Sequence, residues 1–316
     1  MRDEDIRLLH TLEDAVAEEL NRHLGTAQSW MPHEYVPWDQ GRNFNGVLDG
    51  EEWSAHQSKI SEAARLSLVI NLLTEDNLPS YHHSRAELFG LQGAWGEWLH
   101  RWTAEEGRHS IAIRDYLLTS RSVDPVELEE LRMTQLSKGH EADASASILH
   151  SMVYLTVQEL ATRMAHRNTG SASGDPICDQ MMARIAKDEN LHMLFYRNLL
   201  GSALEVAPDR TMVAFKDIVT QFRMPGHSIP GFQRAARLVA VEGIYNLRIH
   251  HDDVLLPILR KLRVLDLGGL GTEGAAAQEE LGAYLSELST RATRFDEVRA
   301  AILSKKTALA ESGEKQ

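Results

Sequence analysis

The feature of this sequence that most constrains its fold is a pair of Glu-x-x-His motifs. One motif is formed by Glu106 and His109, and the other by Glu189 and His192. Residues three positions apart lie on the same face of an α-helix, so the carboxylate and the imidazole of each motif can bind one metal ion. A single motif of this kind is common on solvated helix faces. Two copies in matched contexts predict one shared site.

A further glutamate precedes each motif at nearly the same distance. Glu75 lies 31 residues before Glu106, and Glu159 lies 30 residues before Glu189. About thirty residues correspond to one long helix, a turn and the return to mid-height of the next helix, at about 1.5 Å per residue. Four helices would then present four carboxylates and two imidazoles to one interior. That ligand set is typical of carboxylate di-iron bundles. Mixed oxygen and nitrogen ligands favour two iron ions, with manganese as a substitute, over a tetrahedral zinc ion.

The alternative is that all six side chains face solvent. Burying them without partners would cost several kcal/mol each, which a metal pair would offset. The neighbouring residues favour burial, because Leu68–Leu73 and Met152–Val157 are largely apolar segments that precede Glu75 and Glu159. We therefore predict a dimetal centre with the ligands Glu75, Glu106, His109, Glu159, Glu189 and His192.

Composition limits the other possibilities. The chain has 316 residues, of which 43% are hydrophobic, and this is ample for a large core. Its net charge of −13 argues against nucleic acid as the main partner. The single cysteine, Cys178, excludes an intrachain disulfide and fits a reducing cytosol, so we expect a cytoplasmic protein. The N-terminus has no apolar signal segment, and no run of 18 apolar residues predicts a transmembrane helix.

Apolar periodicity and helix-capping residues predict an all-α protein. We expect an aromatic, Pro- and Gly-containing loop over residues 25–54 to pack across the bundle. A helix over residues 55–87 would hold Glu75 near its middle and a kink at Pro79, and another would end near Asn168–Gly170. The helices are predicted over residues 4–24, 55–87, 94–120, 125–138, 142–168, 175–200, 209–222, 230–248, 250–262 and 273–312. The later helices are expected to cover the same core, which gives one domain over residues 1–316 with a disordered tail over about 311–316.

Three further residues are candidates for catalysis, each with a structural alternative. Thr162 follows Glu159 by three residues, and its hydroxyl would either manage protons during O₂ activation or bond back to its own helix. Asp188 would either accept a hydrogen bond from a ligand imidazole or lie exposed on the helix. For Trp30, packing is a more common role than electron transfer.

Several segments together resemble a known family, the soluble acyl-carrier-protein desaturases, and most closely their actinobacterial, mycobacterial-type members. The resemblance extends to about residue 300 and is carried by Ser29–Asp39, Leu73–Tyr81, Arg101–His109, Val157–Arg163, His166–Gly170, Ala186–His192 and Gln221–Gly226. It implies a ferritin-like four-helix bundle elaborated by outer helices. It also implies that the six predicted ligands bind two iron ions.

The resemblance implies a reaction and partners as well. Family members are homodimers that use O₂ to insert a cis double bond into an acyl chain carried on acyl-carrier protein. Thr162 is then expected to act in O₂ activation. Electrons from a ferredoxin are expected to pass through Trp30 and Asp188 to His109.

The sequence departs from the family pattern at two places. Gly107 replaces an asparagine, at a helix cost of about 1 kcal/mol. Asn190 and Leu191 stand where the plant enzymes have two basic residues, so a basic contact for the carrier protein is not expected from these two positions. Other basic residues are candidates for that contact, namely Arg260, Lys261 and Arg263.

Four alternatives share parts of this pattern. The small subunit of ribonucleotide reductase carries a radical tyrosine four residues after its first ligand histidine, where this chain has Ile113. A di-iron hydroxylase of the multicomponent monooxygenase type would use the same scaffold on a substrate without a carrier protein. A ferroxidase or iron-storage protein would be a shorter chain that assembles into a cage. A partner subunit without activity is disfavoured by the intact ligand set.

Overall fold

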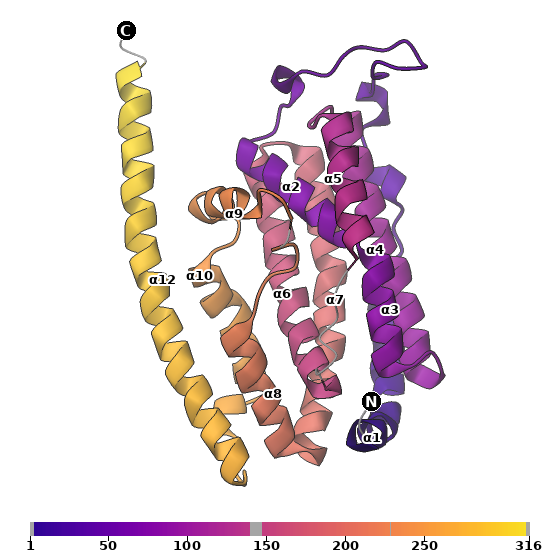
Figure 1. Cartoon of the computed structure of the whole chain (residues 1–316), viewed down its shortest axis with the longest axis vertical. Coiled ribbons are helices and arrows are strands. Elements are labelled where there is room, and N and C mark those ends of the chain that lie inside the picture. Colours follow the sequence, from indigo (N-terminus) through magenta and orange to yellow (C-terminus); the bar gives the residue numbers. More distant parts are fainter. Residues whose placement is uncertain (1–2, 140–146, 228, 314–316) are drawn as a thin grey trace.

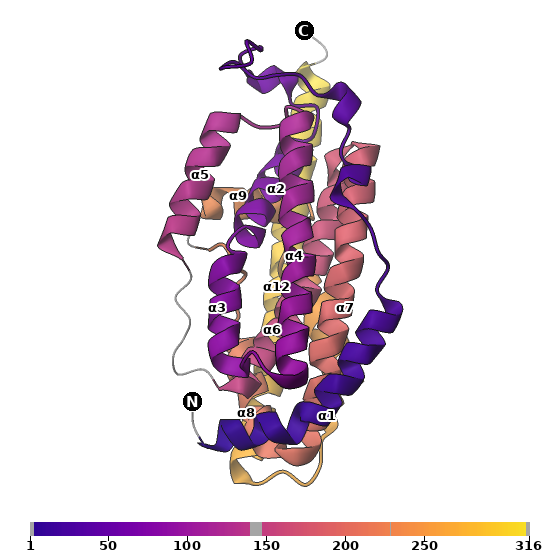
Figure 2. The ribbon, with the colours of Figure 1, turned by 90° about the vertical axis from the view of Figure 1, so that its right-hand side faces the viewer.

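The computed structural model describes residues 3–139, 147–227 and 229–313, and within them the predicted all-α class is confirmed. The only β-type pairing in these residues is an isolated bridge between Phe44 and Glu51. Four helices form the centre of the molecule (Figures 1 and 2). They are α2 (Glu62–Glu75), α4 (Gly93–Thr119), α6 (Ile148–Ser173) and α7 (Pro176–Val206).

The N-terminal segment wraps one side of this bundle. Helix α1 (Asp3–Thr26) packs on α4 and α7, and the following loop contains three short 3₁₀ turns, Pro32–Tyr35, Trp38–Gln40 and Ala55–Gln57. The loop is anchored by the buried Arg121, whose guanidinium donates hydrogen bonds to four loop carbonyls. Trp30 is also buried. The prediction of an ordered loop that packs across the bundle is therefore confirmed.

The prediction of one kinked helix over residues 55–87 is wrong. The chain instead forms α2 and a separate helix, α3 (Leu78–Phe89), and Glu75 is the last residue of α2. Asn77 lies between them with non-helical dihedral angles (φ −78°, ψ 10°). Pro79 lies in the first turn of α3, where the missing N–H has no helical partner to lose. The proline therefore starts a helix here and does not kink one.

Helix α6 is longer than predicted at its C-terminal end. It continues past Gly170 to Ser173 and is capped by Gly174, whose φ of 75° is left-handed. Gly170 instead allows close packing on α7, because a Cβ atom there would lie 3.0 Å from Asp179 Cα. The predicted start at residue 142 lies outside the described residues. The observed start follows Ser147, whose side chain accepts a hydrogen bond from the backbone N–H of His150.

The helix starts predicted at Asp-Pro pairs are confirmed. Asp124 and Asp175 each accept a hydrogen bond from a backbone N–H in the first turn of the helix that follows. Those helices are α5 (Pro125–Lys138) and α7, and α7 runs to Val206, beyond the predicted end near residue 200.

The C-terminal third forms an outer layer on α6 and α7 (Figure 1). The helix predicted over residues 230–248 is interrupted, because α9 ends at Val241 and Gly243 turns the chain with a φ of 81°. The helix predicted over residues 250–262 begins with a π-helical segment. The layer consists of α8 (Pro208–Gln221), α9 (Phe232–Val241), α10 (Leu247–Ile249), η4 (His250–Leu255), α11 (Leu256–Lys261), η5 (Val264–Asp266) and α12 (Thr272–Gly313).

The long helix α12 packs on α8 through apolar side chains and continues beyond the outer layer. Of the tail expected to be disordered, residues 311–313 belong to α12, and residues 314–316 lie outside the described part of the chain. None of the helices in the described ranges is long and apolar enough to span a bilayer.

Candidate metal centre

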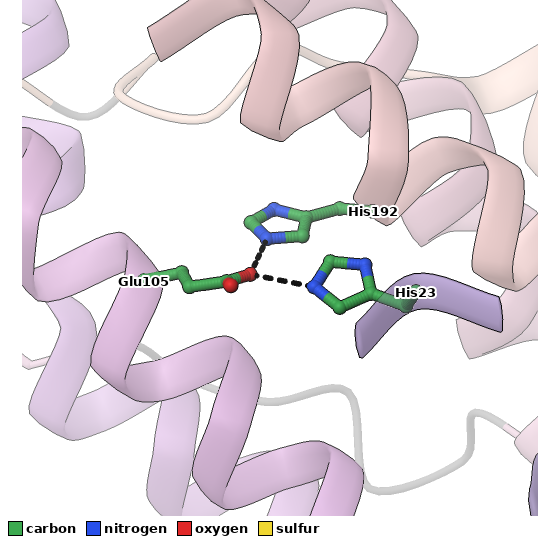
Figure 3. Close-up of side chains that lie close together, drawn as sticks. All are labelled: His23, Glu105 and His192. Carbon is green, nitrogen blue, oxygen red and sulfur yellow. Dashed lines mark hydrogen bonds and ion pairs between the residues drawn. The ribbon is translucent and has the colours of Figure 1, made fainter. Parts of the chain in front are cut away.

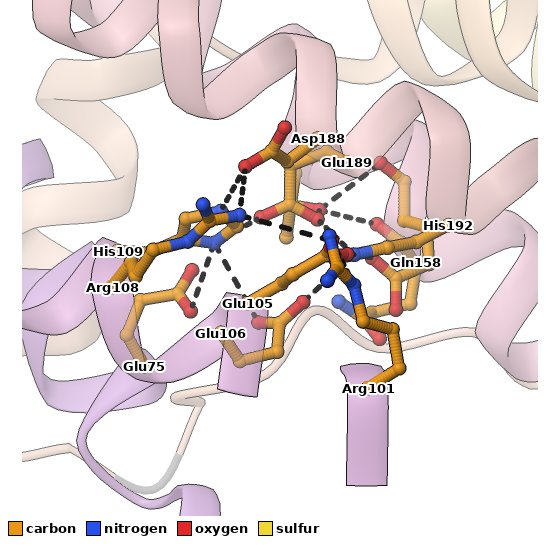
Figure 4. Close-up of polar contacts among 12 residues, drawn as sticks. Glu75, Arg101, Glu105, Glu106, Arg108, His109, Gln158, Asp188, Glu189 and His192 are labelled. Carbon is orange, nitrogen blue, oxygen red and sulfur yellow. Dashed lines mark hydrogen bonds and ion pairs between the residues drawn. The ribbon is translucent and has the colours of Figure 1, made fainter. Parts of the chain in front are cut away.

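The six predicted ligands come together inside the four-helix bundle. Figure 4 labels five of them, namely Glu75, Glu106, His109, Glu189 and His192. Their ligand atoms form two groups, in each of which all atoms lie within 4.8 Å of one another. The first group is Glu75, Glu106, His109 and Glu189, and the second is Glu106, Glu159, Glu189 and His192. Glu106 and Glu189 belong to both groups. They therefore lie where two neighbouring ions would share carboxylate ligands.

Helix geometry accounts for this convergence. Each Glu-x-x-His pair lies on one face of a helix, α4 or α7, and the single glutamates come from α2 and α6. The two pairs approach each other closely: His192 Nδ1 lies 2.9 Å from Glu106 Oε1, and His109 Nδ1 lies 3.3 Å from Glu189 Oε1. The imidazole of each pair therefore faces the carboxylate of the other.

The site is buried, and several of its polar atoms have no hydrogen-bond partner. None of the six side-chain residues exceeds 7% exposure. In the described part of the chain, both carboxylate oxygens of Glu159, one oxygen of Glu189 and the Nδ1 atoms of both histidines have no hydrogen bond. Buried polar atoms normally have partners, because leaving them without one costs about 1–3 kcal/mol each. Metal ions bound by these atoms would remove that cost, so the residues fit a dimetal centre.

The electrostatics of the site support the same conclusion. Burial, together with the charge of Glu75, raises the pKa of Glu106 to about 7. Burial, together with the charge of Glu189, raises the pKa of Glu159 to about 8. The positive groups of the protein therefore do not fully balance the negative charge of the four carboxylates. Two divalent cations would balance four carboxylates, and hard oxygen ligands with two imidazoles suit iron or manganese.

Glu75 differs from these two carboxyls. Burial acts to raise its pKa, but contacts with His109 and His166 hold the pKa well below the ordinary value. His166 was not predicted as a site residue. It is buried on α6, and its Nε2 lies 3.3 Å from Glu75 Oε1 and 3.4 Å from Glu189 Oε1.

Thr162 lies between the site and a cavity. Its hydroxyl is within hydrogen-bond distance of two carbonyls of its own helix (3.1 Å each) and of Glu189 Oε2 (3.2 Å). Both roles considered for this residue are thus geometrically available. Thr162 also lines a mainly apolar cavity of about 140 Å³, whose other walls include α2, α9 and the segment between α8 and α9. The other lining residues are Ser67, Ile70, Asn71, Thr74, Ala165, Met224, Pro225, Phe232, Ala236, Val239 and Tyr245.

Trp30 and Asp188 are brought next to His109. The indole N–H of Trp30 donates to Asp188 Oδ2 at 2.7 Å, and this oxygen lies 3.5 Å from His109 Nε2. The rings of Trp30 and His109 are nearly parallel, at 15° with centroids 6.3 Å apart. Asp188 is buried, and although burial opposes it, the contact with His109 lowers the pKa of Asp188 to about 2. The alternative that Asp188 is an exposed helix carboxylate is therefore wrong.

The imidazole of His192 has a carboxylate partner that sequence reasoning missed. Glu105 Oε2 lies 2.9 Å from His192 Nε2 and 2.9 Å from Nε2 of His23 (Figure 3). Glu105 and His23 are both buried. A signal for Glu105 was present, because it directly precedes Glu106 as Asp188 directly precedes Glu189. His23 had no such signal, since a lone histidine on an apolar helix face is usually a core residue.

The positions at which the sequence departs from the family pattern are Gly107, Asn190 and Leu191. A Cβ atom at Gly107 would meet only Leu78 Cδ2, at 3.8 Å, so the helix has room for a larger residue there. Asn190 and Leu191 are half-buried. The basic residues considered for carrier-protein contact, Arg260, Lys261 and Arg263, are exposed on α11 and just beyond it.

Comparison with known proteins agrees with this architecture. The family model described as "Fatty acid desaturase" matches residues 4–311. DesA1 of Mycobacterium tuberculosis, named as an acyl-carrier-protein desaturase, is 46% identical over 299 residues, which cover 92% of this chain and 88% of DesA1. A stearoyl-carrier-protein 9-desaturase of Brassica napus is 28% identical over 315 residues, which cover 94% of this chain and 77% of the plant protein.

A solved structure shows the same fold. The X-ray structure of DesA2 from Mycobacterium tuberculosis superposes with a TM-score of 0.67 at 29% identity, and the match covers 81% of this chain and 99% of DesA2. The chain therefore belongs to the fatty acid desaturase family, and it has the ferritin-like helical fold. The family resemblance expected from the sequence is confirmed, and with it the assignment of the chain as an oxidoreductase.

Proposed function

We propose that this protein is a di-iron acyl-carrier-protein desaturase that uses O₂ to insert a cis double bond into a saturated fatty acyl chain. The observation that carries the proposal is the pair of overlapping ligand groups, in which buried carboxylate and imidazole atoms lack other partners. The names of DesA1 and of the plant relative support acyl-carrier protein as the carrier of the substrate. The proposed iron ligands are Glu75, Glu106, His109, Glu159, Glu189 and His192.

The residues of this chain would share the work as follows. Bound iron supplies the capacity to reduce O₂ and to oxidise an unactivated C–H bond. The apolar cavity beside Thr162 would hold part of the acyl chain and exclude water from it. The Thr162 hydroxyl, within 3.2 Å of Glu189 Oε2, would hold a proton at the boundary between this cavity and the ligands.

The partners follow from the same proposal. Electrons would come from a ferredoxin or a similar donor and reach His109 through Trp30 and Asp188, which form a continuous contact. The carrier protein is acidic in character, so an exposed basic group such as that at Arg260, Lys261 and Arg263 suits its docking. We also propose a homodimer, as in the family the sequence resembles, and a cytoplasmic location, which the single cysteine, Cys178, favours.

The test is mass spectrometry of the product. Iron-loaded protein would be incubated with stearoyl- or palmitoyl-carrier protein, ferredoxin, its reductase, NADPH and O₂. The expected product is lighter by two hydrogens, and fragmentation would locate the double bond. A product heavier by one oxygen would replace the proposal with a hydroxylase on the same scaffold. Iron uptake without any change in the acyl chain, together with assembly into a cage, would favour a ferroxidase.

Two ligand variants test the site itself. Glu106→Ala and His192→Ala are expected to lose iron and activity, because each removes a ligand from a closed set. The helical signal in circular dichroism should remain largely unchanged, since the substitutions lie inside preformed helices. Iron content equal to that of the unmodified protein in both variants would contradict the ligand assignment.

A further inference from the structure

The repeat in the sequence is longer than the Glu-x-x-His motif. On α4 the order is Arg101, Glu105, Glu106 and His109; on α7 it is Arg184, Asp188, Glu189 and His192. In each copy an arginine pairs with the acidic residue four positions later, and that acidic residue directly precedes the proposed iron ligand. The nine-residue pattern Arg-x-x-x-acidic-Glu-x-x-His is therefore present twice.

The two acidic residues act across the site and not within their own motif. Asp188, on α7, has its Oδ2 3.5 Å from Nε2 of His109 on α4. Glu105, on α4, has its Oε2 2.9 Å from Nε2 of His192 on α7. Each carboxylate therefore contacts the Nε2 atom of the imidazole on the other helix. Both carboxylate residues are 2% exposed.

Each carboxylate is held in turn by a ring N–H from the N-terminal segment. Trp30 Nε1 donates to Asp188 at 2.7 Å, and His23 Nε2 lies 2.9 Å from Glu105 Oε2. Trp30 is 4% exposed and His23 is 0% exposed. The His23 ring also stacks on the His192 ring, at 24° with centroids 5.8 Å apart, as the Trp30 ring stacks on the His109 ring.

Because the contacts of the two helices match, we propose that Glu105 positions the imidazole of His192, as Asp188 positions that of His109. We also propose that His23 holds the carboxylate of Glu105, as Trp30 holds that of Asp188. The proposal rests on the dimetal centre proposed above. A carboxylate only accepts hydrogen bonds, so Glu105 keeps the proton of His192 on Nε2. The Nδ1 lone pair then faces the centre, where Glu106 Oε1 lies 2.9 Å away. Partners of this type fix ring orientation and tautomer in metal sites.

The two copies of the pattern differ at the position directly before the histidine, which is Arg108 on α4 and Leu191 on α7. Because of this difference, Glu105 depends more on His23 than Asp188 depends on Trp30. Arg108, three residues after Glu105, places its Nη2 3.2 Å from Asp188 Oδ2 but 3.8 Å from Glu105 Oε1. The equivalent position on α7 is Leu191, which has no charge. Glu105 therefore has one close guanidinium partner, Arg101, with Arg108 at 3.8 Å, and its Oε2 also contacts His23. Asp188 has two close guanidinium partners and the indole of Trp30.

The experiment compares Glu105→Gln with Asp188→Asn, using anaerobic titration with ⁵⁷Fe(II) and Mössbauer spectroscopy of the loaded protein. The control is Glu97→Gln, an exposed glutamate on the same helix. Loss of such a partner typically weakens metal binding by about 10–100-fold. We expect Glu105→Gln to weaken one of two irons and to change one quadrupole doublet, and Asp188→Asn to change the other. Changes in the same doublet, or a spectrum of Glu105→Gln identical to that of the control, would overturn the proposal.

His23 is tested by a pair of variants. His23→Gln keeps an N–H donor toward Glu105, whereas His23→Leu removes it at similar size. We expect iron affinity close to that of the unmodified protein in the first and weaker binding, with the same altered doublet as Glu105→Gln, in the second. Equal behaviour of the two variants would overturn the role of His23. Melting curves of the metal-free proteins separate this from misfolding, and an unmodified protein that binds no iron would refute the proposed function itself.

Discussion

The site is built from two sequence repeats, here called its halves: one begins at Glu75 and contains Glu106 and His109, and the other begins at Glu159 and contains Glu189 and His192. The two halves carry the same residue types at the same spacing, but the structure uses them differently. Glu75 is followed seven residues later by His82, and Glu159 is followed seven residues later by His166. Seven residues are about two helical turns, so each histidine would share the face of its glutamate if the helix continued. Only one of the two helices continues.

Helix α6 is unbroken from Ile148 to Ser173 and returns His166 to the site, 3.3 Å from Glu75. Helix α2 ends at Glu75, and α3 carries His82 away to a hydrogen bond with Thr103 at 2.8 Å. Glu75 consequently gains an imidazole partner that Glu159 lacks. The repeated spacing predicts the positions of both glutamates. It predicts the position of the histidine seven residues later only where the helix continues, as in α6.

The largest expected effect falls on both halves alike. Glu75→Gln and Glu159→Gln each remove an anionic ligand, so each should lose at least one of two irons, with affinity weaker by more than the roughly 100-fold typical of supporting residues. Metal analysis after gel filtration measures this, with Glu97→Gln as the control. Full iron content in Glu159→Gln alone would mean that the halves are not equivalent as ligand sources.

A buried imidazole outside both halves sharpens the comparison. The site histidines have raised pKa values despite burial, because carboxylates face them, as the contacts of His109 with Asp188 and Glu189 illustrate. His250, in the π-helical segment, contacts Tyr245 and Phe222 instead. Burial, and then the charge of the neighbouring His251, lowers the pKa of His250 to about 4.

This difference predicts an acid-labile outer layer. Between pH 6.5 and 4 the unfolded chain binds a proton at His250 that the folded protein does not, so the free energy of unfolding falls as the pH falls. The loss is expected to reach about 3 kcal/mol. Urea unfolding of metal-free protein across this range measures it. His250→Gln, which keeps an acceptor for the Tyr245 hydroxyl, should have a flatter profile, and an equally steep profile would contradict the assignment.

The sequence was sufficient to predict that the six proposed ligands converge in one helical bundle, because residue types and helical spacing are local properties. It was also sufficient for the helix starts at Asp124 and Asp175, where the capping side chain is adjacent in sequence. It failed at Pro79 and Gly170, where two local structures were compatible with the residues. Gly170 does not end α6, because it lies inside the helix and allows close packing against α7. That packing is a tertiary contact, which the local sequence does not reveal.

The supporting residues were harder to predict for the same reason. Glu105 and His23 are 82 residues apart and meet only after α1 packs against α4. His166 was part of a segment resembling the family, but its partner Glu75 comes from another helix. Such pairs depend on how helices are rotated against one another, which no single-helix pattern contains.

The next test compares His82 and His166, the two histidines that follow Glu75 and Glu159 by seven residues. His166→Leu removes the imidazole that faces Glu75 and Glu189, and iron affinity should weaken by about 10–100-fold. The matched variant His82→Leu should leave iron affinity unchanged, because its partner is Thr103. The loss of that hydrogen bond should cost only about 1 kcal/mol of stability. Equal effects of both variants on iron binding would show that the break after Glu75 does not separate their roles.

The smallest expected effect is on the metal-free protein, and it has opposite signs in the two halves. Because the pKa of Glu159 is raised to about 8, the folded protein at pH 7 must hold a proton there that the unfolded chain releases, and this opposes folding. Glu159→Gln should therefore be neutral or stabilise the chelator-treated protein by about 1 kcal/mol. Glu75 has a lowered pKa and faces two imidazoles as a carboxylate, so its charge favours folding at the same pH. Glu75→Gln should destabilise the protein by about 1–3 kcal/mol. Urea unfolding at pH 7 compares the two variants, and a shift of the same sign in both would show that His166 does not distinguish the halves.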